Sequence, residues 1–183
     1  NLGKATVVDY EYIGLTIVTS NNIDFVNSLI INTNLTSIAD IKAKVADIVA
    51  EHNYYVLINS GEATLDVFTH LGITGITVEN LNYINLNIKG LNLLTVSEIQ
   101  AKVNALVSIY EYYAVINSGQ ATLDVYTSLG ITGVTSVNIN FINQFIKSAN
   151  CFDLVSLQEK ITLLVERYEC LVRITSGTAT VAD

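Results

Sequence analysis

The sequence predicts an all-α protein built from three copies of one helical unit. Residues 59–75 return almost unchanged at 117–133, and this offset of 58 positions also relates the rest of the chain to itself. Within each copy, apolar residues recur at helical spacing and glycines stand where the expected helices should end. A fixed internal period is typical of proteins assembled from one supersecondary unit. We therefore expect three tandem three-helix modules of 58 residues, stacked end to end.

The repeat divides the 183 residues into modules 1–58, 59–116 and 117–174, with 175–183 as the start of a fourth repeat or a tail. A unit of this size folds only marginally alone, so neighbouring units are expected to support each other. The chain begins without a methionine and ends inside a repeat. We expect either a fragment of a longer array or a processed subunit.

The middle module shows the first two helices most clearly. Thr64 is expected to cap a short helix that Gly72 ends, and Asp66 lies in its first turn, where the helix dipole favours an acid. Thr77 is expected to cap a second helix that ends at Gly90. The buried face of this second helix is marked by Leu81, Ile84 and Ile88.

A longer third helix is expected to follow. Residues 95–98 read Thr-Val-Ser-Glu, a capping box, and Gly119 is expected to end the helix. An apolar stripe runs about 20 residues, or about 30 Å, at helical spacing. Its members are Ile99, Val103, Leu106, Tyr110 and Tyr113.

The outer modules carry the same signals with different residues. The positions of Thr77 and Thr95 are occupied there by the capping residues Thr19, Thr135, Ser37 and Asp153. The tyrosine-rich segments 54–58 and 112–116 contain strand-forming residues, which leaves short strands as an alternative. The stripe keeps a helical period up to these tyrosines, which favours the helix.

The composition argues against two classes of partner. The formal net charge is -8 with only nine Lys and Arg, so no basic surface is expected for nucleic acid or anionic membranes. No apolar run reaches the roughly 18 to 20 residues of a membrane span. With 14% charged residues and a mean hydropathy of +0.43, we expect apolar surface to be covered between modules or between molecules.

The sequence contains no pattern typical of an enzyme or of a metal or cofactor site, so none of these is expected. His52 and His70 do not recur at the offset of 58, and His52 is interpreted as a core or boundary residue. Cys151 and Cys170 occupy the positions of Leu93 and Tyr112. About 25 Å of helix should separate the two cysteines, too far for a disulfide, so both are expected to be thiols.

Two recurring sets of residues are candidates for contacts between modules or for assembly. Asn27, Asn85 and Asn143 repeat one place in the second helix, although Asn is a poor helix former. They should either hydrogen-bond to the Thr-Gly connection or an adjacent unit, or share a binding role. Tyrosine suits a half-buried junction between modules, although an adhesive patch is the alternative. The tyrosines concerned, near the end of the long helix, are Tyr54, Tyr55, Tyr112 and Tyr113.

Residues 129–143, Leu-Gly-Ile-Thr-Gly-Val-Thr-Ser-Val-Asn-Ile-Asn-Phe-Ile-Asn, resemble the helical repeats of very large secreted or surface-attached bacterial proteins, including adhesin-like arrays. The resemblance covers the first two helices of the second and third modules well and the first module loosely. It implies an extracellular or cell-surface location and a structural or adhesive role, with no catalytic residues to transfer.

The sequence therefore predicts a structural, self-associating segment of a bacterial surface protein, such as a stalk, a spacer or a filament subunit. Its partners would be copies of itself or neighbouring repeats of a longer chain. The alternative is an adhesive binding module that presents helical faces to a host protein or glycan. An intracellular helical scaffold is also open.

Overall fold

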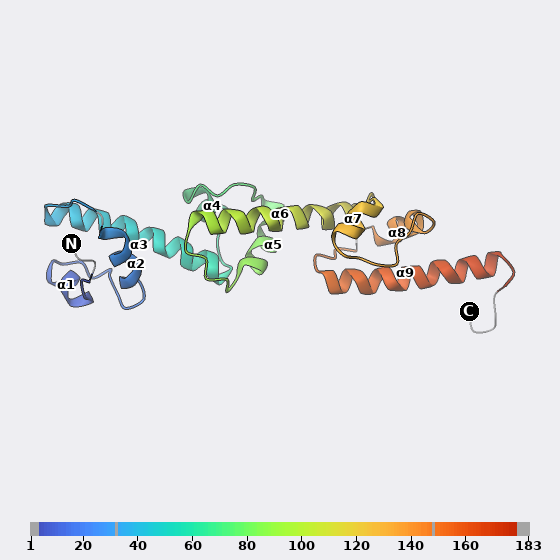
Figure 1. Cartoon of the computed structure of the whole chain (residues 1–183), viewed down its shortest axis with the longest axis horizontal. Coiled ribbons are helices and arrows are strands. Elements are labelled where there is room, and N and C mark those ends of the chain that lie inside the picture. The colour runs from blue at the N-terminus through green and yellow to red at the C-terminus, as the bar shows by residue number, and fades with distance from the viewer. Residues whose placement is uncertain (1–3, 32, 148, 179–183) are drawn as a thin grey trace. The chain divides into compact units, whose positions relative to one another are not determined.

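The computed structural model describes residues 4–31, 33–147 and 149–178, and every regular element in this part of the chain is an α-helix (Figure 1). The expected all-helical fold class is confirmed, and the alternative of short strands at the tyrosines is wrong. Contacts divide the chain into two compact units, residues 1–103 and 104–183, which are described separately. The module boundaries after residues 58, 116 and 174 stay a prediction.

The first unit consists of two sets of short helices and a long helix that contacts both. Its elements are α1 (Val7–Tyr12), α2 (Ile23–Ile30), α3 (Ile38–Ser60), α4 (Leu65–His70), α5 (Val78–Ile88) and the beginning of α6 (Val96–Ser118). The helix α3 packs against α2 and also against α4 and α5 (Figure 1). One core cluster joins α1 and α2 to α3 through Tyr10, Leu15, Val18, Val26, Ile30, Val45, Ile48 and Val49.

The second unit repeats the order of two short helices followed by a long helix. It contains the rest of α6, then α7 (Leu123–Ser128), α8 (Ile139–Ile146) and α9 (Leu154–Thr175). The helix α8 packs along α9 (Figure 1). Three apolar residues of α9, 58 positions after Ile99, Val103 and Leu106, are buried: Leu157 and Ile161 are 0% exposed and Leu164 is 7% exposed.

Most predicted helix starts are confirmed by their capping bonds. The Thr95 hydroxyl accepts from the Glu98 amide at 3.2 Å, and the Glu98 carboxylate accepts from the Thr95 amide at 3.1 Å. Ser37 and Asp153 cap α3 and α9 through their side-chain oxygens. Thr64 is the N-cap of α4, as predicted, but its side chain accepts no capping bond among the described residues.

Two predicted starts are wrong by three residues. Thr19 and Thr135 were expected to cap the second helices, whereas α2 and α8 begin only after Asn22 and Asn138. Each Asn still accepts from the threonine amide, at 2.8 Å, so the capping contact is present. The helices begin later because residues 20–22 and 136–138 form a turn before the first helical residue.

The long helices α3 and α6 end at glycines that the repeat places 58 residues apart. Gly61 and Gly119 both adopt a left-handed φ of 74°, which an L side chain rarely takes. The amide of Gly61 donates to the carbonyl of Ile58 at 3.0 Å, and that of Gly119 donates to Ile116 at 2.9 Å. Neither α3 nor α6 therefore continues into the next short helix.

Candidate assembly site

The three recurring asparagines hold the chain that leads into each first short helix. The side-chain amides of Asn27, Asn85 and Asn143 donate to a backbone carbonyl 22 residues earlier, at 2.8 Å in each case. The three carbonyls belong to Ala5, Ala63 and Ala121. Each asparagine is hydrogen-bonded, as expected, but the predicted partner is wrong: the acceptor lies in the same copy, before the first short helix, and not in the Thr-Gly connection or an adjacent unit. The structure leaves untested any further role of these residues in assembly.

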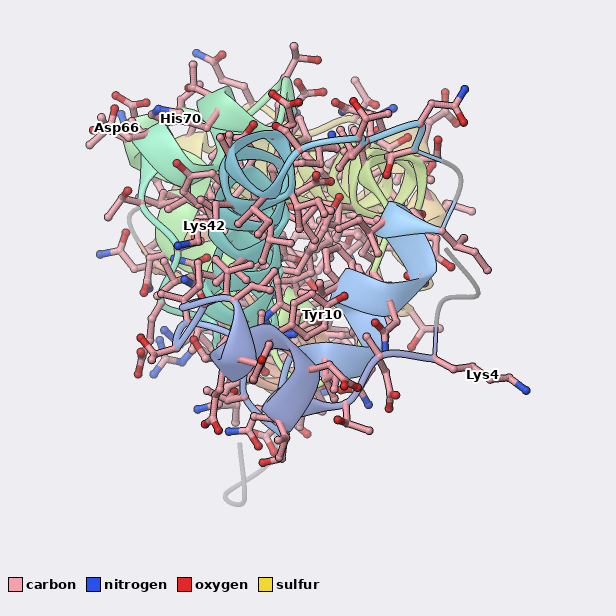
Figure 2. The ribbon with its side chains drawn as sticks, turned by 90° about the vertical axis from the view of Figure 1, so that its left-hand side faces the viewer. Lys4, Tyr10, Lys42, Asp66 and His70 are labelled. Atoms are coloured by element: carbon pink, nitrogen blue, oxygen red, sulfur yellow. The ribbon has the colours of Figure 1, made fainter. Side chains whose placement is uncertain are left out.

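The side-chain oxygen of the recurring asparagine is bonded differently in the middle copy than in the outer two. The Tyr10 hydroxyl donates to Asn27 Oδ1 at 2.8 Å, and the Tyr126 hydroxyl donates to Asn143 Oδ1 at 2.7 Å. Tyr10 points into the interior of its unit (Figure 2). The equivalent residue in the middle copy is Phe68, which has no hydroxyl.

Asn85 Oδ1 is consequently a buried acceptor without a hydrogen-bond partner among the described residues. The tyrosine that serves this function elsewhere is deeply buried. Burial raises the pKa of Tyr126 to about 12. Burial, followed by the charge of Asp9, raises the pKa of Tyr10. Both hydroxyls therefore stay protonated donors at neutral pH.

The end of each long helix fits closely against the second short helix of the next set. A Cβ placed on Gly61 would lie 2.8 Å from the backbone oxygen of Asn85, and one placed on Gly119 would lie 2.6 Å from that of Asn143. Both distances are shorter than real Cβ contacts. Only glycine allows the long helix to end this close to α5 or α8.

A second asparagine fixes each long helix to the linker beyond that short helix. The Asn59 side chain donates to the Leu93 carbonyl and accepts from the Leu93 amide, both at 2.8 Å. Asn117 makes the same pair of bonds to Cys151, at 3.0 and 3.1 Å. Both asparagines begin the copied segment that reveals the repeat, but their role was not predicted, because their partners lie 34 residues away.

The candidate tyrosines of α3 face different neighbours. Tyr54 is half-buried, and its ring centroid lies 5.4 Å from that of His70 in α4. Tyr55 is buried and packs its edge on Phe25 of α2 at 5.6 Å. Its hydroxyl donates to the Glu51 carboxylate at 2.7 Å. Burial and this neighbouring carboxylate raise the pKa of Tyr55.

The candidate tyrosines of α6 lie near the linker that precedes α9. Tyr113 is buried, and its ring centroid lies 6.2 Å from that of Phe152 in an edge-on arrangement, while the ring of Tyr110 stacks on Phe152 at 5.3 Å between centroids. Burial, followed by the charge of Asp153, raises the pKa of Tyr113. Tyr112 is half-buried. Within each unit, the buried tyrosine therefore packs in the interior, against Phe25 for Tyr55 and against Phe152 for Tyr113.

The histidine and cysteine interpretations are supported by the contacts. His52 is half-buried, and its ring lies 5.2 Å from Phe25. Its equivalent Tyr168 lies 5.5 Å from Phe141 in the same arrangement. Cys151 is buried and Cys170 half-buried, and no disulfide joins them, as predicted.

Two other kinds of site are a metal site and a membrane-spanning helix. In the part of the chain that the structure describes, no group of three or more His, Cys, Asp or Glu could hold a metal ion. The helices in the same residues include none that is long and apolar enough to cross a membrane. An open apolar groove, which the sequence did not predict, runs along α9 and is lined by Leu154, Val155, Gln158, Glu159, Thr162 and Leu163.

Comparison of the chain with family models, with curated proteins and with solved structures gives no match.

Proposed function

We propose that this chain is a structural, self-associating segment of a bacterial extracellular or cell-surface protein, acting as a stalk, a spacer or a filament subunit. One observation carries the proposal: the contacts at the end of α3 recur at the end of α6, with each residue displaced by 58 positions. The repeated contacts are the asparagine pairs Asn59–Leu93 and Asn117–Cys151 and the glycine contacts Gly61–Asn85 and Gly119–Asn143.

These contacts suit an array of identical units. In the proposed arrangement, three tandem modules of 58 residues stack end to end, and each long helix belongs to its own module and to the next. Every added repeat then buries the same surface as the one before it, so stability grows by nearest-neighbour contacts. The function proposed is mechanical, and it assigns no catalytic residue and no cofactor.

The partners proposed are copies of this chain or further repeats of a longer one. The surface location comes from the resemblance of residues 129–143 to secreted bacterial repeat proteins. Charged residues make up only 14% of the chain, so few charges have to lose their hydration where a second copy binds.

The apolar groove on α9 favours adhesion as a second candidate function. Leu154, Val155 and Leu163 are 46%, 68% and 58% exposed along one helix. A host protein with a complementary apolar helix would cover them. Capture of a defined host protein that is lost in Val155→Asp, with self-association unchanged, would support this alternative over a spacer.

Negative-stain electron microscopy of the purified chain across a concentration series tests the structural proposal. We expect elongated particles that lengthen as concentration rises. Globular particles of constant size at every concentration would contradict self-association.

A further inference from the structure

We propose that a hollow between α8 and α9 binds a phosphate monoester, that is, a phosphate group joined to an apolar group. The hollow has a volume of about 360 Å³, and small-molecule sites typically have volumes of about 300–1,000 Å³. Three of the side chains that line it are cationic, and these are Lys147, Lys160 and Arg167. This inference goes beyond the mechanical role and does not depend on self-association.

The three cations concentrate positive charge in a chain that is acidic as a whole. The formal net charge is -8, and the chain contains only nine Lys and Arg. The described residues that line the hollow include no Asp or Glu, although Glu159 and Glu166 lie close by in the sequence of α9. Cations around one hollow repel each other, so a bound anion would lower their electrostatic energy.

Two packed helices hold the cations in place. Lys160, Leu163 and Arg167 follow each other at steps of three and four residues in α9, so they lie on one side of that helix. Lys147 comes directly after the last residue of α8, and it adds a charge from a second element. Since α8 packs along α9, the two sources of charge face the same space.

The hydrogen bonding of these cations leaves donors for a ligand. The Lys160 ammonium donates to the Ala149 carbonyl at 3.0 Å, which positions the group and uses one of its three N–H bonds. Among the described residues, neither Lys147 nor Arg167 has a hydrogen-bond or ion-pair partner for its side chain. A guanidinium presents parallel N–H donors that match two oxygens of a phosphate.

The number of positive charges favours a phosphate over a carboxylate. A phosphate monoester carries a charge of about -1.5 to -2 at neutral pH and three acceptor oxygens. A carboxylate carries one negative charge and two oxygens. Three cations from two elements therefore attract the phosphate more strongly.

Two exposed apolar side chains line the same hollow and provide a surface for the apolar group. Phe145 is 54% exposed and Leu163 is 58% exposed. Leu163 also lines the apolar groove along α9, so an apolar group bound beside the cations can extend into that groove. Covering these side chains would remove apolar area from water.

The combination is found in the third copy only, so packing between repeats does not require it. Lysine recurs at the position of Lys160, but Arg167 and Leu163 replace uncharged or acidic residues of the other copies. The equivalents of Arg167 are Ile109 and Glu51, and those of Leu163 are Ala105 and Asp47.

Titration of the isotopically labelled chain with hexyl phosphate, followed by nuclear magnetic resonance, tests the site. We expect saturable shifts of amide signals in α8 and α9. Inorganic phosphate should bind more weakly because it lacks the apolar group, and hexanoate should bind more weakly because it carries less charge. Equal affinity for inorganic phosphate would overturn the role of the apolar side chains, and equal affinity for hexanoate would overturn the assignment to a phosphate.

The variant Arg167→Ile tests the cation that the third copy alone carries. It introduces the residue that the second copy has at this position, so the helix should be kept, as circular dichroism would verify. The dissociation constant for hexyl phosphate should rise by about fivefold. An unchanged dissociation constant would contradict the site.

Lys160→Gln and Lys44→Gln form a matched pair, because the two lysines are equivalent in the repeat and each change removes one positive charge. Lys160→Gln should weaken binding, whereas Lys44→Gln should leave it unchanged. Equal weakening in both variants would mean that only the net charge attracts the anion, which would overturn the site. The absence of saturable shifts in the parent at millimolar hexyl phosphate would also overturn it, while the proposed mechanical function would stand.

Discussion

At the residue scale, the middle repeat differs from its neighbours by one hydroxyl group. Tyr10 and Tyr126 complete the hydrogen bonding of Asn27 and Asn143, while Phe68 leaves Asn85 Oδ1 unsatisfied in a buried place. A buried polar atom without a partner costs about 1–3 kcal/mol. The middle repeat therefore carries a local defect that the outer two lack.

Phe68→Tyr is expected to stabilise the protein by about 1 kcal/mol, because the added hydroxyl reaches Asn85 Oδ1 as Tyr126 reaches Asn143. In a chain of this size the melting temperature should rise by about 2–4 °C. The measurement is thermal unfolding followed by circular dichroism.

The reverse change serves as the control. Tyr126→Phe removes the hydroxyl from an intact pair, so it should destabilise the protein by about 1–2 kcal/mol. If both substitutions lower the melting temperature, the hydrogen bond is not what distinguishes these repeats.

The sequence predicted some of these residues and missed others for a clear reason. The recurrence of Asn27, Asn85 and Asn143 in a helix is visible in the sequence and indicates a bonded amide. The partner of each is visible only once the chain is folded, because it lies 22 residues earlier. The role of Asn59 and Asn117 was missed although both recur, because their partners lie 34 residues away.

At the scale of helices, capping interactions mark the helix starts. Acidic residues serve this purpose in α1, α6 and α9, at Asp9, Glu98 and Asp153. Hydrogen bonds to these carboxylates hold the pKa of each below its usual value. The largest contribution comes from the Thr6 amide for Asp9 and from the Thr95 hydroxyl for Glu98. For Asp153 it comes from the Ser156 amide.

Acid is expected to weaken the fold through these caps. Because the folded-state pKa values are depressed, the stabilisation is complete above the unfolded values of 3.8 for Asp and 4.5 for Glu. It is lost as the pH falls through the lower folded-state values. The melting temperature should therefore drop as the pH falls from 5 to below the usual pKa values of these carboxyls.

The triple variant Asp9→Asn, Glu98→Gln, Asp153→Asn provides the comparison, since it keeps the capping oxygens and removes the charges. Its melting temperature should fall less over the same pH range. An identical fall in parent and variant would show that other carboxylates determine the acid sensitivity.

The glycines that end the long helices give a prediction with an internal control. Gly61→Ala and Gly119→Ala should each destabilise the protein by more than about 2 kcal/mol, because the left-handed strain of about 1–2 kcal/mol adds to the clash with a backbone oxygen. Gly177→Ala carries the strain alone and should cost about 1 kcal/mol.

Urea unfolding at low protein concentration measures the three effects while self-association is absent. Equal costs at all three glycines would mean that the close approach to Asn85 and Asn143 does not constrain the helix ends.

The sequence predicted which segments are helical, but it misplaced the first residues of two helices. Periodicity and glycines placed the three long helices, and their ends at Gly61 and Gly119 are correct. The starts of α2 and α8 were misplaced because Thr19 and Thr135 make the expected capping contact before the backbone becomes helical. A capping signal in the sequence thus locates a contact more reliably than the first helical residue.

The repeat has a consequence at the scale of the whole molecule. Equivalent positions make equivalent bonds, such as Thr74 with Gln100 and Thr132 with Gln158, each at 2.9 Å from the threonine amide. Deleting residues 59–116 removes one full period and joins equivalent positions. We expect that shortened chain to keep a cooperative, fully helical fold with a lower melting temperature, because one set of neighbour contacts is lost.

Deleting residues 59–100 is the matched control, because it joins positions that are not equivalent. This variant should lose cooperative unfolding. If the two deletions behave alike in circular dichroism and thermal unfolding, the period of 58 does not define the unit of folding.

The sequence predicted the helical class and the period, and it could not determine how far each long helix serves the repeat that follows. That sharing appears only in contacts that cross the predicted boundary, as between Tyr54 of α3 and His70 of α4.

Sedimentation velocity from micromolar to millimolar concentration tests most directly whether copies of this chain associate in the way its repeats do. We predict that the weight-average sedimentation coefficient rises continuously with concentration, without a plateau, as expected for open-ended self-association. A coefficient that stays at the monomer value over the whole range would contradict the account.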